Sequence, residues 1–126
     1  MPVPLTEAQV TKQCVDFLEA ERWKCVRLQS GLFQRPGGKS RVKVGEEGIP
    51  DYVCFRQDNF FFLEFKRKGG RVRPSQKKWI AEAEAEYITV VIINGLDILR
   101  AWLSQRGWYI ERYRTRWNDN PLESRP

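Results

Sequence analysis

The chain has 126 residues and a net charge of +6, so we expect one domain with its own core and a polyanionic partner such as nucleic acid. It contains no histidine, which excludes Ser-His-Asp triads, and its 3 cysteines are an odd number in apolar surroundings, which indicates free thiols in a reducing cytoplasm. No apolar run approaches the length of a membrane span and no signal peptide is visible, so we expect a cytoplasmic protein without a membrane partner.

The apolar pattern predicts helices and strands in the order α-β-β-β-α-β-α. The first helix begins at a capping box, Thr6 to Gln9, and continues to about Arg22. The predicted strands cover residues 23–29, 51–56, 59–67 and 87–93, and the later helices cover 75–86, capped by Ser75, and 96–105. Residues 30–48 form a long loop with a short strand or hairpin arm at 41–44. A single domain spans 1–126, with its core at about 6–105 and a tail, 106–126, that adds a short strand near 109–113 or is partly disordered.

The most informative residues belong to the second and third predicted strands. Glu64 and Lys66 are two positions apart in an apolar run, so in a strand their side chains share one face while the odd-numbered residues point to the core. Asp51 opens the preceding run, and if the two strands pair, Asp51 and Glu64 come together. Two carboxylates about 4 Å apart repel each other by roughly 4 kcal/mol at an effective dielectric near 20. A divalent cation such as Mg²⁺, which prefers oxygen ligands, would stabilise the pair.

The lysine beside these carboxylates is open to two interpretations. In a metal site, Lys66 would orient or deprotonate an attacking water, or stabilise charge that develops on a phosphate. In the structural alternative, Lys66 forms a cross-strand ion pair with Asp51 or Glu64 and no metal is bound. The spacing Glu-x-Lys occurs by chance in many strands, but the Gly-Ile-Pro turn directly before Asp51 favours the metal site.

Two segments near these carboxylates are dense in positive charge. The cations of the long loop are Arg35, Lys39, Arg41 and Lys43, and those that follow Lys66 are Arg67, Lys68, Arg71, Arg73, Lys77 and Lys78. The second segment leads into a predicted helix N-terminus, where backbone N–H groups attract phosphate. We predict that both segments bind a nucleic-acid backbone, and the alternative is a solvated charge run without a partner.

Taken together, these motifs resemble the PD-(D/E)XK nuclease superfamily and, within it, the VRR-NUC branch. The resemblance rests on the order of an acidic residue that opens the first helix, Arg-x-x-Ser-Gly, Gly-x-Pro-Asp, Glu-x-Lys, a glycine-containing loop and a helical glutamine. In this chain these are Glu7, 27–31, 48–51, 64–66, Gly70 and Gln76, within roughly residues 6–93. Without the resemblance, Glu7 and Gln76 would be unremarkable residues at helix starts.

The resemblance implies an α/β fold with a restriction-endonuclease-like αβββαβ core, in which helices flank a central mixed β-sheet. It implies Mg²⁺ or Mn²⁺ held by Asp51 and Glu64, with Lys66 acting on the nucleophilic water. Glu7, as a further metal ligand, and Gln76 would complete the catalytic site. Stand-alone members of this branch are similar to Holliday-junction resolvases and act as homodimers, so the implied substrate is branched DNA in repair or recombination.

We therefore predict a metal-dependent, structure-specific DNA endonuclease that hydrolyses phosphodiester bonds in branched DNA such as Holliday junctions. Two alternatives stay open at this point. A non-catalytic nucleic-acid-binding module would bind with a steep salt dependence and never cut. A sequence-specific restriction or nicking endonuclease would prefer one linear duplex sequence to a branched one.

Overall fold

The structure is a computed structural model that describes residues 3–29, 31–34, 37 and 41–110. In the two short strands 31–34 and 41–44 the description covers the backbone only. The chain divides into two units, residues 1–96 and 97–126, and each is described by itself. The first unit contains the sheet and all the residues of the predicted metal site.

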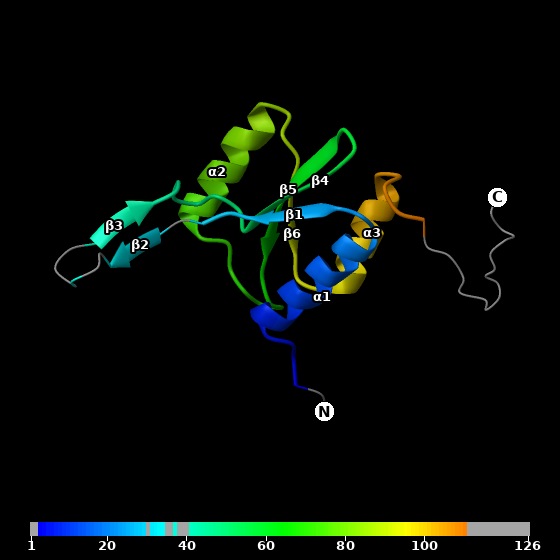
Figure 1. Ribbon diagram of the computed structural model, residues 1–126, viewed down its shortest axis with the longest axis horizontal. Helices are drawn as coiled ribbons and strands as arrows, with labels where there is room; N and C mark the ends of the chain where they lie inside the picture. The colour runs from blue at the N-terminus through cyan, green and yellow to red at the C-terminus, as the bar shows by residue number, and fades with distance from the viewer. Residues whose placement is uncertain (1–2, 30, 35–36, 38–40, 111–126) are drawn as a thin grey trace, which may run out of the picture. The chain divides into compact units, whose positions relative to one another are not determined.

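A four-stranded sheet in the order β1-β4-β5-β6 organises the first unit (Figure 1). Its strands are β1 (Lys24–Arg27), β4 (Tyr52–Arg56), β5 (Asn59–Phe65) and β6 (Val90–Ile93). Strand β4 is antiparallel to both of its neighbours, β1 and β5, whereas β6 runs parallel to β5. Helices α1 (Glu7–Ala20) and α2 (Pro74–Ala85) flank this mixed sheet, so the predicted α/β class is confirmed and the order αβββαβ is consistent with a restriction-endonuclease-like core.

The long loop between β1 and β4 contains a separate antiparallel hairpin. Its strands are β2 (Gly31–Gln34) and β3 (Arg41–Val44), which pair with each other in a two-stranded sheet. The predicted arm at 41–44 is therefore present as β3. Strand β2 was not predicted, because a run of four residues is too short for alternation to stand out.

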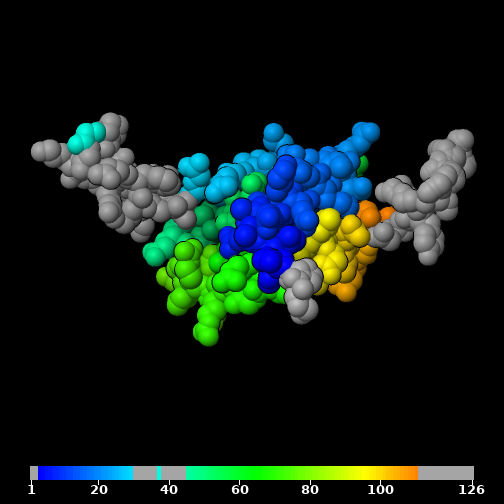
Figure 2. Space-filling model, turned by 90° about the horizontal axis from the view of Figure 1, so that it is seen from below, coloured from blue at the N-terminus to red at the C-terminus, as the bar shows by residue number. Residues whose placement is uncertain are grey.

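The α1 face of β5 forms the apolar core of the first unit. Phe61, Leu63 and Phe65 are each 0% exposed, as the odd-numbered pattern predicted. Helix α1 contributes Val10, Cys14 and Leu18 to the same buried set. Thr6 caps α1 through a capping box with Gln9, as predicted, and the outer face of α1 is solvent-exposed, which Figure 2 shows in blue.

The α2 face of β5 carries different residues. Phe62 meets Trp79 of α2 edge to face, with ring centroids 5.1 Å apart. Glu64 points to this same face, since it is two positions from Phe62. Helix α2 is otherwise shallowly packed, and its one buried residue is the polar Gln76. The apolar side chains Trp79, Ile80 and Ala83 of α2 are only half-buried.

Several predicted boundaries were wrong. Helix α1 and strands β1 and β5 end at Ala20, Arg27 and Phe65, earlier than the predicted ends at about 22, 29 and 67. Helix α2 begins at Pro74 with Arg73 as its N-cap, not at Ser75, because proline has no N–H to satisfy and its fixed φ suits the first helical position. Strand β6 begins at Val90, since Tyr87 follows α2 in a left-handed conformation with φ 62°. In the tail, residues 109 and 110 are not in a strand, and the rest of the predicted strand lies outside the described residues.

The second unit contains most of α3 (Leu96–Gln105), which has the predicted bounds. Its buried residues are Leu99 and Leu103. The longest described helix has 14 residues, and none of the described helices combines the length and apolar character that a bilayer requires. That residues 1–126 fold as one domain stays a prediction.

Candidate active site

A tight loop brings the first carboxylate to the end of the sheet. Gly48 has φ +86°, and a Cβ built on it would lie 2.2 Å from the backbone oxygen of Ser75 in α2. A side chain at this position would therefore separate the loop from α2. Pro50 is buried directly before Asp51, so the loop leaves Asp51 in one place at the start of β4.

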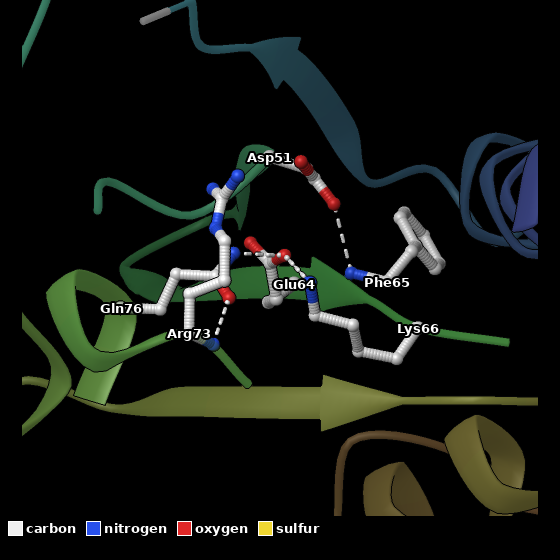
Figure 3. Close-up of polar contacts among 6 residues, drawn as sticks. All are labelled: Asp51, Glu64, Phe65, Lys66, Arg73 and Gln76. Atoms are coloured by element: carbon white, nitrogen blue, oxygen red, sulfur yellow. Dashed lines mark hydrogen bonds and ion pairs between the residues drawn. The ribbon is translucent and has the colours of Figure 1, made fainter. Parts of the chain in front are cut away.

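The Asp51 side chain accepts a hydrogen bond just beyond the end of the backbone ladder between β4 and β5. The last paired residues are Tyr52 and Leu63, so continuation of the register sets Asp51 opposite Glu64. Asp51 Oδ2 accepts a 2.9 Å hydrogen bond from the backbone N–H of Phe65, which has passed the end of the ladder. This bond satisfies a buried donor and aims the aspartate at the neighbouring strand (Figure 3).

Glu64 is a buried carboxylate in which one oxygen is hydrogen-bonded and the other has no hydrogen-bond partner. Its residue exposure is 3%. Oε2 accepts a hydrogen bond of 2.6 Å from Gln76 Nε2 and lies 3.3 Å from Lys66 Nζ. Oε1 is buried and has no hydrogen-bond partner. A buried anionic oxygen without a donor is destabilising, so this atom has the chemistry of a ligand for a cation.

Electrostatics at Glu64 agree with that conclusion. Burial raises the pKa of the Glu64 carboxyl, and the nearby negative charge of Asp51 raises it further. The pKa is lowered by the charge of Lys66 and by the hydrogen bonds from Lys66 and Gln76, but these do not cancel the increase. The charge of Asp51 therefore disfavours the charged form of Glu64, which is the condition that a divalent cation relieves.

Gln76 is oriented by two hydrogen bonds of opposite polarity. Its Oε1 accepts a 2.9 Å bond from the backbone N–H of Arg73, the N-cap of α2. Its Nε2 therefore faces Glu64 and donates to Oε2. This is the reverse half of a capping box, in which an N3 side chain satisfies an N-cap donor. The helix start thus fixes which end of the amide meets the carboxylate.

The structure brings together four of the five predicted catalytic residues, which we call the polar cluster: Asp51, Glu64, Lys66 and Gln76. Glu7 is exposed on the first turn of α1 and lines a cavity of about 450 Å³ with Asp51, Arg27 and Tyr52. Glu64 does not line this cavity. Among the described residues, no group of three or more carboxylates and thiols gathers tightly enough to hold a metal ion. A cation at Asp51 and Glu64 would therefore need water or substrate oxygens as further ligands.

The predicted DNA-binding cations divide into two groups. Those that follow Lys66 are all exposed: Arg67, Lys68, Arg71, Arg73, Lys77 and Lys78. For the other group, Arg35 and Lys39 lie outside the described residues, and the side chains of Arg41 and Lys43 are not described. The exposed group lies in the segment that runs from the end of β5 through the first turns of α2, the helix that carries Gln76.

The model of the VRR-NUC domain family matches residues 7–97. The chain belongs to the VRR-NUC family. The matched range contains Glu7 and the whole polar cluster, and a VRR-NUC domain implies nuclease activity and hence binding to DNA. Comparison with curated proteins and with solved structures gave no match.

Two features of this VRR-NUC site were missed at the level of sequence. The link between Arg73 and Gln76 has a recognisable signal, since glutamine at the third helical position is half of a capping box. The wrong choice of Ser75 as the N-cap hid that signal. The ladder-ending bond from Phe65 to Asp51 has no local signal, because it depends on where strand pairing stops.

Proposed function

We propose that this VRR-NUC protein is a metal-dependent DNA endonuclease that hydrolyses phosphodiester bonds. The observation that supports the proposal most is the buried, partnerless Oε1 of Glu64 beside a second carboxylate, Asp51. Mg²⁺ or Mn²⁺ fits these residues because both ions prefer carboxylate oxygens and complete their shell with waters and phosphate. Asp51 and Glu64 would hold the ion together with water and phosphate oxygens, and Glu7, which lines a cavity with Asp51 but not with Glu64, would contribute only if it moved toward the ion.

The other members of the cluster act on the carboxylate and on the substrate. When bound, the ion would polarise the scissile phosphate and favour ionisation of a water. Gln76 and Lys66 both bind Oε2 of Glu64, which leaves Oε1 for the ion. The Lys66 side chain is 14% exposed and its Nζ lies 3.3 Å from Glu64, so we assign its ammonium group to orienting an attacking water or stabilising charge on phosphate beside the ion.

We propose branched DNA, such as a four-way junction, as the substrate and a homodimer as the active form. Because a single site cuts one strand, paired cuts across a junction require two sites related by symmetry. The exposed cations between the end of β5 and the first turns of α2 are suited to bind the phosphate backbone. The 3 cysteines, none of them in a disulfide, agree with a place in the reducing cytoplasm.

The test is cleavage of end-labelled DNA on a denaturing gel. The substrates are a four-way junction and a linear duplex with the same sequences, each with Mg²⁺, Mn²⁺ or EDTA. We expect cleavage of the junction that requires the metal and is lost in Asp51→Ala. Asp58→Ala, which removes an exposed carboxylate in the turn between β4 and β5, is the matched control and should cut normally.

The same gel separates the competing functions. Binding by all variants with a steep salt dependence, without any cleavage, would replace the nuclease by a binding module. Preference for one linear sequence over the junction would favour a restriction or nicking enzyme. Equal cutting by the wild type and Asp51→Ala would remove Asp51 from the site.

A further inference from the structure

Strands β1 and β4 place two cysteines directly opposite each other. In the register of this pair, Cys25 is the partner of Cys54. At the end of the same ladder, the N–H of Leu28 donates to the carbonyl oxygen of Asp51 over 2.7 Å, which makes Leu28 and Asp51 a hydrogen-bonded pair. Hydrogen-bonded and non-hydrogen-bonded pairs alternate along an antiparallel ladder, so Cys25 and Cys54, three positions away, form a non-hydrogen-bonded pair.

A non-hydrogen-bonded pair is the arrangement that brings opposed side chains closest. Its Cα atoms are about 4.5 Å apart. That spacing lies at the short end of the range of about 4.4–6.8 Å that a disulfide spans. Both thiols point to the α1 face of the sheet, since Cys54 is also the partner of Phe61, which lies in the core. A disulfide between them would therefore need little movement of the backbone.

The two thiols differ in a way that suits them to sequential roles. The Cys54 thiol donates a hydrogen bond to the Cys25 sulfur, which lowers the pKa of Cys25. That same hydrogen bond and burial raise the pKa of Cys54. Cys54 is fully buried, whereas Cys25 is half-buried on an edge strand of the sheet. Cys25 is thus the more reactive thiol, and Cys54 lies next to it as a resolving thiol.

We propose that Cys25 and Cys54 form a reversible intramolecular disulfide when the protein meets a peroxide. The Cys25 thiolate attacks one peroxide oxygen, the O–O bond breaks, and a sulfenic acid and one water form after proton uptake. The Cys54 sulfur then attacks the Cys25 sulfur, the S–O bond breaks, and a second water leaves with the Cys54 proton. The two thiols are oxidised by two electrons in total, and hydrogen peroxide is reduced to two waters.

The disulfide would link the two ends of the segment 25–54, which contains the β2–β3 hairpin and Asp51. A thiol reductant would reopen it, because a disulfide at the short end of the Cα range is more easily reduced than an unconstrained one. This inference is independent of the proposed nuclease activity. It concerns a site of oxidative modification about which the family match carries no information.

The experiment is peroxide titration of the reduced wild-type protein, followed by intact mass and peptide mapping in denaturant without reductant. We expect a loss of about 2 Da, a cross-linked pair of peptides containing Cys25 and Cys54, and recovery of the mass with dithiothreitol. Thiols that react with a disulfide reagent should fall from 3 to one. The melting temperature should rise by several degrees, because the bridge restricts the unfolded chain.

Variants assign the bridge to this pair. Cys14→Ser is the matched control and should still lose about 2 Da, whereas Cys25→Ser and Cys54→Ser should not. A wild-type product that gains about 16, 32 or 48 Da without a cross-link would overturn the proposal. A bridge that involves Cys14, or a disulfide between two chains, would overturn it equally, and both outcomes are read from the wild type alone.

Discussion

Strand β5 has two faces that use the same backbone for opposite purposes. Toward α1 it presents Phe61, Leu63 and Phe65, all fully buried and all apolar. Toward α2 it presents Phe62 and then Glu64, a buried carboxylate whose Oε1 has no partner. The α1 face stabilises the fold through apolar burial, whereas the α2 face tolerates an unfavourable group that is suited to chemistry.

The difference between the two faces of β5 explains why the site lies at one end of the sheet. A carboxylate in the middle of the α1 face would be surrounded by carbon and would have no donor within reach. At the end of β5, the start of α2 supplies Gln76 as a donor, and the end of the β4 ladder supplies a second carboxylate, Asp51. Glu64 can be buried here although its Oε1 has no hydrogen-bond partner, because Gln76 of α2 and Asp51 at the start of β4 place polar groups beside it.

The largest expected effect is on activity, from the change Glu64→Gln on the α2 face. The amide oxygen can still accept from Gln76 and Lys66, so the fold should be retained, but the anionic oxygen that would bind the metal is lost. We expect metal-dependent cleavage to fall by about 10²–10³-fold. Single-turnover cleavage of junction DNA in saturating Mg²⁺ measures it.

The unfolding midpoint of Glu64→Gln in urea with EDTA is the matching control. It should equal or exceed that of the wild type, because the change removes a buried charge close to Asp51. A variant that cuts normally, or one that loses activity only because it unfolds, would contradict the division of β5 into two faces.

The next effect is on stability, from Phe61→Ala on the α1 face. The ring is fully buried and meets Trp23 edge to face at 5.1 Å, so its removal leaves a cavity and breaks an aromatic contact. We expect the free energy of unfolding to fall by about 3–5 kcal/mol, as measured by urea denaturation. The folded fraction should cut DNA at the wild-type rate. A specific loss of cleavage at full folding would mean that the two faces are not separate.

A smaller effect is expected from Gly48→Ala, which tests the close contact between the loop before Asp51 and α2. Its Cβ would meet the backbone of Ser75 at 2.2 Å, and its φ of +86° disfavours any side chain. We expect a loss of about 2–3 kcal/mol in the free energy of unfolding together with reduced cleavage. Gly69→Ala is the matched control, since Gly69 also has positive φ, +80°, but nothing lies within 4 Å of its Cβ position. Equal effects of the two changes would show that backbone strain, not the contact with Ser75, accounts for the loss.

The sequence predicted the part of this comparison that depends on local pattern. Alternation along 60–66 assigned the two faces of β5, and the pairing of β4 with β5, which the prediction of the site required as a condition, is present in the structure. The order of the elements followed from apolar periodicity in the same way.

What could not be predicted depends on tertiary register or on competition at a helix start. The pairing of Cys25 with Cys54 joins strands that are separated by the β2–β3 hairpin, so no local pattern encodes it. Arg73 replaces Ser75 as the N-cap because Pro74 decides where α2 begins. The place of Glu7 relative to Glu64 depends on how α1 packs on the sheet, which the spacing of apolar residues does not specify.

The smallest expected effect concerns Gln76→Ala, which tests whether the helix start serves the site. Loss of the amide removes one donor from Glu64 Oε2 and the acceptor for the N–H of Arg73, but leaves both carboxylates in place. Removal of a group that orients a metal ligand typically lowers activity or metal affinity by about 10–100-fold. We therefore expect a rise in the Mg²⁺ concentration that gives half-maximal cleavage, with a smaller loss of the rate at saturating metal.

Gln76→Glu distinguishes orientation of Glu64 from capping of α2. A glutamate at this position can still accept from the N–H of Arg73, so the helix start keeps its cap, but its other oxygen cannot donate to Glu64. If Gln76 acts on the carboxylate, Gln76→Glu will impair metal-dependent cleavage at least as strongly as Gln76→Ala. If Gln76 only caps the helix, Gln76→Glu will cut DNA at the wild-type level. In that case α2 contributes no side chain to the site, and the α2 face of β5 acts without it.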